Sequence, residues 1–251
     1  MSSLKILQLN VWGGRIKDGL TRFISEGGYD VVCMQEAIWE EKETGFLKLF
    51  VDDVDKIKVG AGFLYDYRST NFGVKILNNE VCCKQGNVIL SKIPFVATEE
   101  KVVLDGDSFA TNASNFLEAI RGHRYTAQKV VLENGLVVVN YHGYWLPNPI
   151  GDETTVSCMR AVADMIRGEN RPVVMCGDLN VSAESPAMRE LDFLTDLTAA
   201  NKVKTTLRNV RFVADVACDH ILVSKNTSYD NFKVVNAPVS DHKALTVEIS
   251  L

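Results

Sequence analysis

The fold is decided by the stretch Val173-Val174-Met175-Cys176-Gly177-Asp178-Leu179-Asn180. Its first half is continuously apolar, and its second half turns polar at Asp178. A short, solidly apolar run is typical of a strand that is covered on both faces, as in α/β proteins. We therefore expect Asp178 to lie at the end of a buried strand, where open α/β sheets bind their ligands.

The same pattern recurs elsewhere along the chain. Asn10, Glu36 and His142 each follow an apolar run of their own. Strand ends that meet at one edge of a sheet bring such side chains together. The sequence therefore predicts one convergent polar site built from these residues and Asp178.

Apolar runs bounded by Gly, Asn and Asp predict strands at residues 4–11, 29–34, 87–90, 101–104, 127–132, 136–141, 172–176, 220–223 and 244–249. Helical periodicity predicts helices at residues 20–24, 46–50, 156–166 and 186–191. Asp152 and Ser185 are the predicted helix starts, because Asp and Ser accept hydrogen bonds from free backbone donors. Residues 1–251 show no linker or low-complexity tract, so we expect a single domain.

Composition limits the compartment and the class of partner. No run approaches the ~20 apolar residues that a membrane span needs. The six cysteines form no C-x-x-C pair, which favours reduced thiols and a cytoplasmic location. The net charge of −5 argues against a nonspecific binder of polyanions, although a local basic cleft or a divalent metal can act against the global sign.

The dipeptide Asp-His occurs twice, at Asp219-His220 and at Asp241-His242. A carboxylate beside an imidazole orients the ring and raises its basicity, which suits acid–base chemistry near neutral pH. His220 remains open to the plainer interpretation that it packs beside Asp219.

Six short motifs appear in order along nearly the whole chain: Leu9-Asn10-Val11-Trp12, Met34-Gln35-Glu36, Gly86-Asn87-Val88-Ile89-Leu90-Ser91, Gly177-Asp178-Leu179-Asn180, Asp219-His220-Ile221-Leu222-Val223-Ser224 and Ser240-Asp241-His242. Together they resemble the endonuclease/exonuclease/phosphatase superfamily. The resemblance implies an α/β fold, a four-layer α/β/β/α sandwich of two mixed β-sheets packed face to face with helices outside.

The resemblance also implies a role for each matching residue. Asn10, Glu36 and Asp241 correspond to the binding site of a divalent cation, usually Mg²⁺ with Mn²⁺ as a substitute, and hard oxygen ligands suit Mg²⁺. Asp178 resembles the carboxylate that orients or deprotonates the attacking water, and Asn180 the amide that holds the water or a phosphate oxygen.

Two histidines complete the pattern. Asp219 resembles the residue that orients His242, and His242 the donor to a phosphate oxygen in the transition state. His142 matches a second histidine that contacts phosphate in deoxyribonuclease I and many phosphatases. The glutamate that partners this histidine has no counterpart here, and Asn87 is the candidate for its polar role and for contact with substrate.

Four further residues are candidates for substrate binding. Arg121 and Arg124, together with His123, form a basic cluster suited to phosphate. Tyr144 and Trp145 follow His142 and could stack on bases or fill the core beneath the loop. Arg15 and Lys17 could also bind phosphate, but charges in such a loop are more often solvated surface.

Three hypotheses of function follow. The first is a metal-dependent phosphodiesterase or nuclease that hydrolyses a phosphodiester, with nucleic acid as the expected substrate. The second keeps this chemistry but acts, as a phosphatase or sphingomyelinase-like enzyme, on a phospholipid headgroup or a small phosphorylated metabolite. The third is a noncatalytic binding module of the same fold. The sequence indicates no protein partner.

Overall fold

The computed structural model describes residues 3–41, 47–75, 81–107, 109–110, 122–208 and 215–251. Within these ranges the strands form two sheets. The first sheet has the order β12 (Ser228–Val235), β13 (Ala244–Ser250), β1 (Ser3–Asn10), β2 (Val31–Glu40), β4 (Val81–Ser91), β3 (Tyr65–Lys75) and β6 (Phe109–Ala110). The second has the order β10 (Leu194–Asp196), β11 (Asp219–Ser224), β9 (Val173–Asp178), β8 (Val137–Tyr141), β7 (Tyr125–Leu132) and β5 (Phe95–Leu104).

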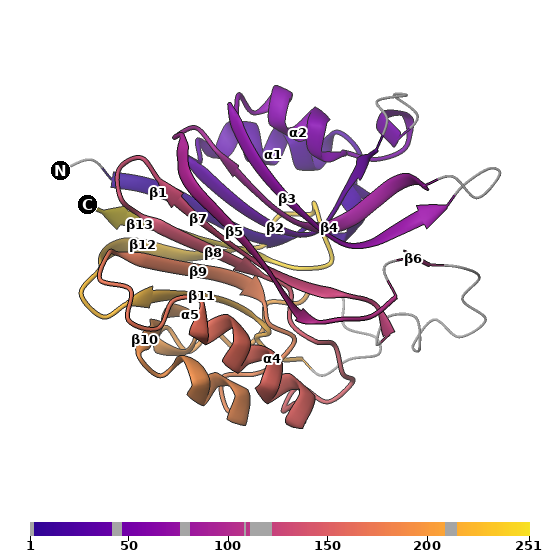
Figure 1. Cartoon of the computed structure of the whole chain (residues 1–251). Coiled ribbons are helices and arrows are strands. Elements are labelled where there is room, and N and C mark those ends of the chain that lie inside the picture. The colour runs from indigo at the N-terminus through magenta and orange to yellow at the C-terminus, as the bar shows by residue number, and fades with distance from the viewer. Residues whose placement is uncertain (1–2, 42–46, 76–80, 108, 111–121, 209–214) are drawn as a thin grey trace.

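Both sheets are mixed. β1 runs parallel to β2 but antiparallel to β13, and β8 runs parallel to β9 but antiparallel to β7. Figure 1 shows helices α1 (Gly19–Gly27) and α2 (Val54–Gly60) outside the first sheet, and α4 (Glu153–Asp164) and α5 (Leu197–Ala200) outside the second. The predicted four-layer sandwich is confirmed.

Alternation along the strands explains the layers. Leu7 and Leu9 of β1 pack with Leu20 and Ile24 of α1, whereas Ile6 joins a core cluster between the two sheets. The central strands are covered on both faces, which accounts for their continuous apolar sequence. Residues 6, 8 and 10 of β1 therefore share the face that points into the sandwich.

Inward-facing residues become more polar toward one end of these strands. On β9 the order is Val174, Cys176 and Asp178, and all three are buried. On β8 the order is Val138, Asn140 and then His142, which follows the strand. The site therefore lies where the sandwich interior opens at the polar ends of its central strands.

The predicted strands are all present, with bounds that differ by a few residues, but several polar or exposed strands were missed. β12 is exposed along most of its length and β3 is rich in polar residues, so neither has an apolar run. The sequence also missed β6, β10, α2 and α5.

The helix predictions had mixed outcomes. Asp152 caps α4, since its carboxylate accepts from the Thr155 amide at 2.9 Å. Ser185 begins a 3₁₀ helix (η3, Pro186–Leu191) rather than an α-helix. Of the helix predicted at residues 46–50, residue 46 lies outside the described ranges, and Leu47–Leu49 forms a short 3₁₀ turn (η2).

Gly86 on β4 offers a test of this packing. A Cβ atom at this position would lie 1.9 Å from the Ser69 carbonyl oxygen of β3. Gly86→Ala should therefore lower the free energy of unfolding by about 1–3 kcal/mol through overpacking, as measured by urea denaturation. Gly122→Ala is the matched control, because no atom of the described residues lies within 4 Å of a Cβ placed at Gly122. Equal losses in the two variants would contradict the packing described.

Candidate active site

The buried carboxylate of Asp178 lies at the centre of the site, at the end of β9. Its Oδ2 atom is 3.7 Å from His142 Nε2 and 3.6 Å from His242 Nε2. Burial alone would raise the pKa of Asp178, but the charges of His242 and His142 and a hydrogen bond from Asn10 lower it below its usual value. Asp178 is therefore held as a carboxylate.

Asn10 connects Asp178 to Glu36. The amide nitrogen of Asn10 donates to Glu36 Oε1 at 2.9 Å and to Asp178 Oδ2 at 3.0 Å. The oxygen of the same amide accepts from the Trp12 backbone at 3.0 Å, which fixes its orientation. Strands β1, β2 and β9 thus meet at one side chain.

The backbone is left-handed at three positions of the site. Trp12, Glu36 and Asn180 have φ values of 49°, 53° and 56°. Glu36 lies where the register between β2 and β4 shifts, which is typical of a β-bulge. Left-handed backbone is unfavourable for residues other than glycine and often occurs at functional sites, where the surrounding structure holds it in place.

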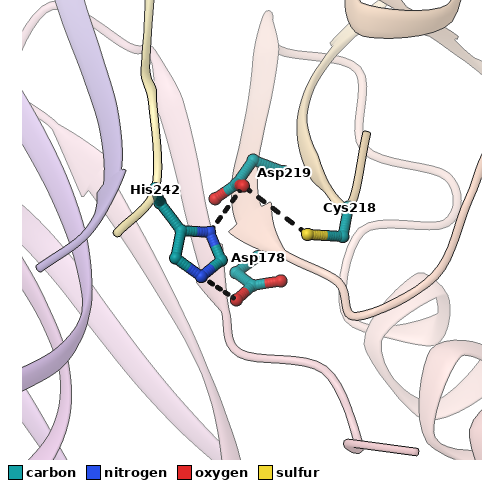
Figure 2. Close-up of side chains that lie close together, drawn as sticks. All are labelled: Asp178, Cys218, Asp219 and His242. Atoms are coloured by element: carbon teal, nitrogen blue, oxygen red, sulfur yellow. Dashed lines mark hydrogen bonds and ion pairs between the residues drawn. The ribbon is translucent and has the colours of Figure 1, made fainter. Parts of the chain in front are cut away.

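His242 forms a dyad with Asp219 of β11. Figure 2 shows the imidazole between Asp219 and Asp178, with Nδ1 2.8 Å from Asp219 Oδ2. Burial alone would lower the pKa of His242, but the two carboxylates raise it well above its usual value. His242 is therefore a protonated donor near neutral pH.

Asp241 and Glu36 provide the oxygen atoms expected of a cation site. Burial raises the pKa of Asp241, and the nearby Glu36 charge raises it further. Two carboxylates that repel one another beside an open cavity fit a divalent cation, which would offset that repulsion. The residues present therefore suit a divalent cation.

These groups line a cavity of about 380 Å³. Its acidic lining residues are Glu36, Asp178 and Asp241, and many of the others are aromatic or apolar. Among the described lining residues, Arg15 is the one arginine or lysine, and its guanidinium lies 4.8 Å from the centroid of the Trp12 ring.

The structure brings most predicted residues together. Those that line the cavity are Glu36, His142, Trp145, Asp178, Asn180, Asp241 and His242, while Asn10 and Asp219 lie directly behind them. Asn180 is anchored by its amide nitrogen, which donates to the Gly143 carbonyl at 2.9 Å. The assigned roles remain predictions.

The substrate-binding predictions fare less well. Asn87 is fully buried and donates to the Thr126 carbonyl at 2.7 Å, so the prediction that it contacts substrate is wrong. Gln85, two residues nearer the N-terminal start of β4, lines the cavity instead. Because alternate residues of a strand share a face, Asn87 lies about 7 Å deeper in the sandwich than Gln85.

Tyr144 and Arg124 are not among the described residues that line the cavity. Tyr144 packs edge-on against Tyr125, in support of the core-filling interpretation. Arg124 pairs with Asp105 at 3.3 Å. Arg121 lies outside the described residues.

The sequence also missed Phe72 and Tyr125, which line the cavity. His123, which the sequence analysis placed in the basic cluster, lines it too, and the rings of His123 and Tyr125 stack with centroids 4.3 Å apart. Phe72 lies on the polar strand β3, and no motif marks Phe72 or Tyr125. Cys218 also lines the cavity, and its thiol is 3.7 Å from Asp219 Oδ2 (Figure 2).

His220 lies away from this site, on the opposite face of β11 from Asp219. Its ring is fully buried, with Nδ1 2.8 Å from Asp196 Oδ2 and Nε2 3.0 Å from the Val181 carbonyl oxygen. Two acceptors require both ring nitrogens to donate. His220 therefore has a structural role, but its partner is Asp196 rather than its neighbour Asp219.

The fold and the site define an α/β-sandwich protein of the phosphoester hydrolase class. The model of the Endonuclease/Exonuclease/phosphatase family matches residues 7–242, and the chain belongs to this family. No curated protein matches the chain. In the described ranges, no helix has the length and apolar character needed to cross a membrane.

Solved structures share the fold at low sequence identity. An endonuclease/exonuclease/phosphatase from Beutenbergia cavernae has a TM-score of 0.69 at 17% identity, covering 100% of this chain and 72% of that one. A mannosyl-6-phosphatase from Bacteroides thetaiotaomicron has a TM-score of 0.67 at 14% identity, with 99% and 100% covered. A humanized TDP2 from D. rerio has a TM-score of 0.69 at 15% identity, with 100% of both chains covered.

The buried pair of His220 and Asp196 predicts a pH-dependent contribution to stability. Burial alone would lower the pKa of His220, but Asp196 raises it above its usual value. The contribution should be fully present below the unfolded histidine value of about 6.5 and lost as pH rises through the raised pKa. His220→Gln should therefore cost more stability at pH 5.5 than at pH 9 in urea denaturation. A cost that does not change with pH would contradict a charged pair.

Proposed function

We propose that the protein is a divalent-metal-dependent phosphodiesterase that hydrolyses its substrate by in-line attack of water. The observation that carries the proposal is the position of Asp178, between two imidazoles and beside the paired carboxylates of Glu36 and Asp241. Glu36 and Asp241 would hold Mg²⁺ or Mn²⁺, with Asn10 beside them donating to Glu36, and the cation would supply Lewis-acid polarisation of a phosphate oxygen.

The residues of the chain supply the remaining steps. A carboxylate with a lowered pKa is a weak base, so Asp178 accepts a hydrogen bond from the attacking water and aligns it. His242, held protonated by Asp219, donates to a phosphate oxygen as negative charge develops. His142 lies beside Asp178, where it can contact phosphate or the leaving group.

The aromatic wall supports a nucleotide-like substrate. Phe72, His123, Tyr125 and Trp145 line the same cavity as the carboxylates, and bases stack on such rings. A phosphodiester of nucleic acid, or of a short nucleotide, would place its phosphate over Asp178 and a base against this wall.

A second candidate is a small phosphorylated metabolite or a phospholipid headgroup. The scarcity of cations favours it, because Arg15 alone among the described lining residues is an arginine or lysine, and the net charge is −5. A polyanion gains much of its affinity from many Lys and Arg contacts. Turnover of sphingomyelin or inositol phosphates in preference to DNA and RNA would favour this candidate.

Hydrolysis of bis-p-nitrophenyl phosphate with Mg²⁺ tests the chemistry. Asp178→Asn removes the acceptor for the water and should lower kcat by about 10²–10⁴-fold. Asp164→Asn, at an exposed carboxylate of α4, is the control and should keep the parent rate. No turnover by the parent protein, or equal turnover by Asp178→Asn, would overturn the proposal.

Trp145→Ala tests the aromatic wall. Loss of one base–aromatic stack, worth about 1–3 kcal/mol, should raise KM for a thymidine dinucleotide about 5- to 150-fold. KM for a diester without a ring, such as glycerophosphocholine, should stay the same. Tyr229→Ala, at an exposed ring of β12, controls for loss of an aromatic side chain elsewhere. Equal changes for both substrates would exclude stacking at this wall.

A further inference from the structure

A layer of neutral amides lies in the sandwich interior directly behind the site. Gln8 of β1, Gln35 of β2, Asn140 of β8 and Gln128 of β7 are all fully buried. Burying a primary amide is costly unless its donors and acceptors are satisfied. Apolar residues fill the inward face further along these strands, so these four positions depart from the local pattern.

The amides form a continuous chain of hydrogen bonds. Gln35 Nε2 donates to Asn140 Oδ1 at 2.7 Å and to Gln8 Oε1 at 2.8 Å. Gln8 Nε2 donates back to Gln35 Oε1 at 2.7 Å and onward to Asp219 Oδ1 at 3.2 Å. We call Asn140, Gln35 and Gln8 the amide relay.

The far end of the relay is fixed by backbone. Asn140 Nδ2 lies 3.0 Å from the carbonyl oxygens of Met34 and Val88, which belong to the first sheet. It also lies 3.1 Å from Gln128 Oε1. The orientation of Asn140 therefore rests on two backbone acceptors and does not depend on Gln128.

The hydrogen bonds of the amide relay allow one orientation of each side-chain amide. Asn140 presents its oxygen to Gln35, so Gln35 must present its nitrogen to Asn140, and its own oxygen then faces Gln8. Gln8 uses its two N–H groups on Gln35 and Asp219. A flipped Gln8 amide would set its oxygen against the Asp219 carboxylate, which is repulsive.

We propose that Gln8 is a positioning residue for Asp219 and, through it, for His242. Asp219 accepts from Gln8 on Oδ1 and from His242 on Oδ2, so its carboxylate is held from both sides (Figure 2 shows the His242 side). The amide relay is anchored on backbone carbonyls of the first sheet, and through its hydrogen bonds it fixes the orientation of the Asp219 carboxylate on the second sheet. The catalytic consequence rests on the proposed function, but the orientation of the dyad does not.

Gln8→Met is the variant that tests this role, because methionine is similar in length and cannot donate to Asp219. Partners behind a catalytic group typically contribute about 10- to 100-fold to activity. We expect kcat on bis-p-nitrophenyl phosphate to fall by about this factor with KM within about twofold of the parent value. Gln128→Met is the matched control, because it removes an equally buried amide that does not contact Asp219.

A readout independent of activity separates positioning from simple destabilisation. The chain has four histidines, so ¹⁵N-histidine spectra can be assigned by single substitution. The Nδ1 proton of His242 should shift upfield in Gln8→Met, as its bond to Asp219 loosens, and should stay in place in Gln128→Met. Unchanged His242 signals in folded Gln8→Met, or equal shifts in both variants, would overturn the proposal even if the protein proves inactive.

The Asp219→Asn variant provides a second measurement should Gln8→Met fail to fold. The side-chain amide protons of Gln8 should move upfield when their charged acceptor becomes neutral, whereas those of Gln128 should not. Gln8 signals that do not respond to Asp219→Asn would show that the contact is absent in solution and would also overturn the proposal.

Discussion

The contact between the buried Asp178 carboxylate and two imidazoles is the interaction on which the rest of the site depends. A carboxylate that is 1% exposed is costly unless it is paired, and His142 and His242 approach it from two different strand ends. That arrangement requires β8, β9 and β13 to present their polar ends at one edge. The four-layer packing of the sandwich produces this edge, because the apolar inward faces of both sheets cover one another up to it.

The buried strands and the polar residues at their ends could be predicted, because strands buried on both faces have continuously apolar sequences. Strands covered on both faces read as apolar runs, so their polar ends at Asn10, Glu36, His142 and Asp178 stood out. Strands without such a run were missed, β3 and β12 among them, and the cavity wall at Phe72 was missed with them. The order of the motifs identified the carboxylates and histidines of the site, but it did not identify aromatic lining residues such as Phe72 and Tyr125.

The sequence also could not predict how far from the cavity opening a side chain lies along its strand. Asn87 and Gln85 share a face of β4, and the sequence offers no measure of which of them lies at the opening. The structure shows Gln85 at the cavity and Asn87 in the interior, bonded to Thr126. The left-handed backbone at Glu36 follows from a register shift against β4, a relation between distant segments that no local pattern reveals.

The same inward faces explain why amides, rather than charges, connect the site to the interior. A lysine or carboxylate at Gln8 or Gln35 would add a charge in a low-dielectric layer and alter the pKa values of Asp178 and His242. Neutral amides fix the orientation of their neighbours through paired donors and acceptors, and they add no charge that would alter these pKa values. Gln8, one inward position before Asn10, can therefore hold Asp219 in place while the charges of the site remain those of its own carboxylates and imidazoles.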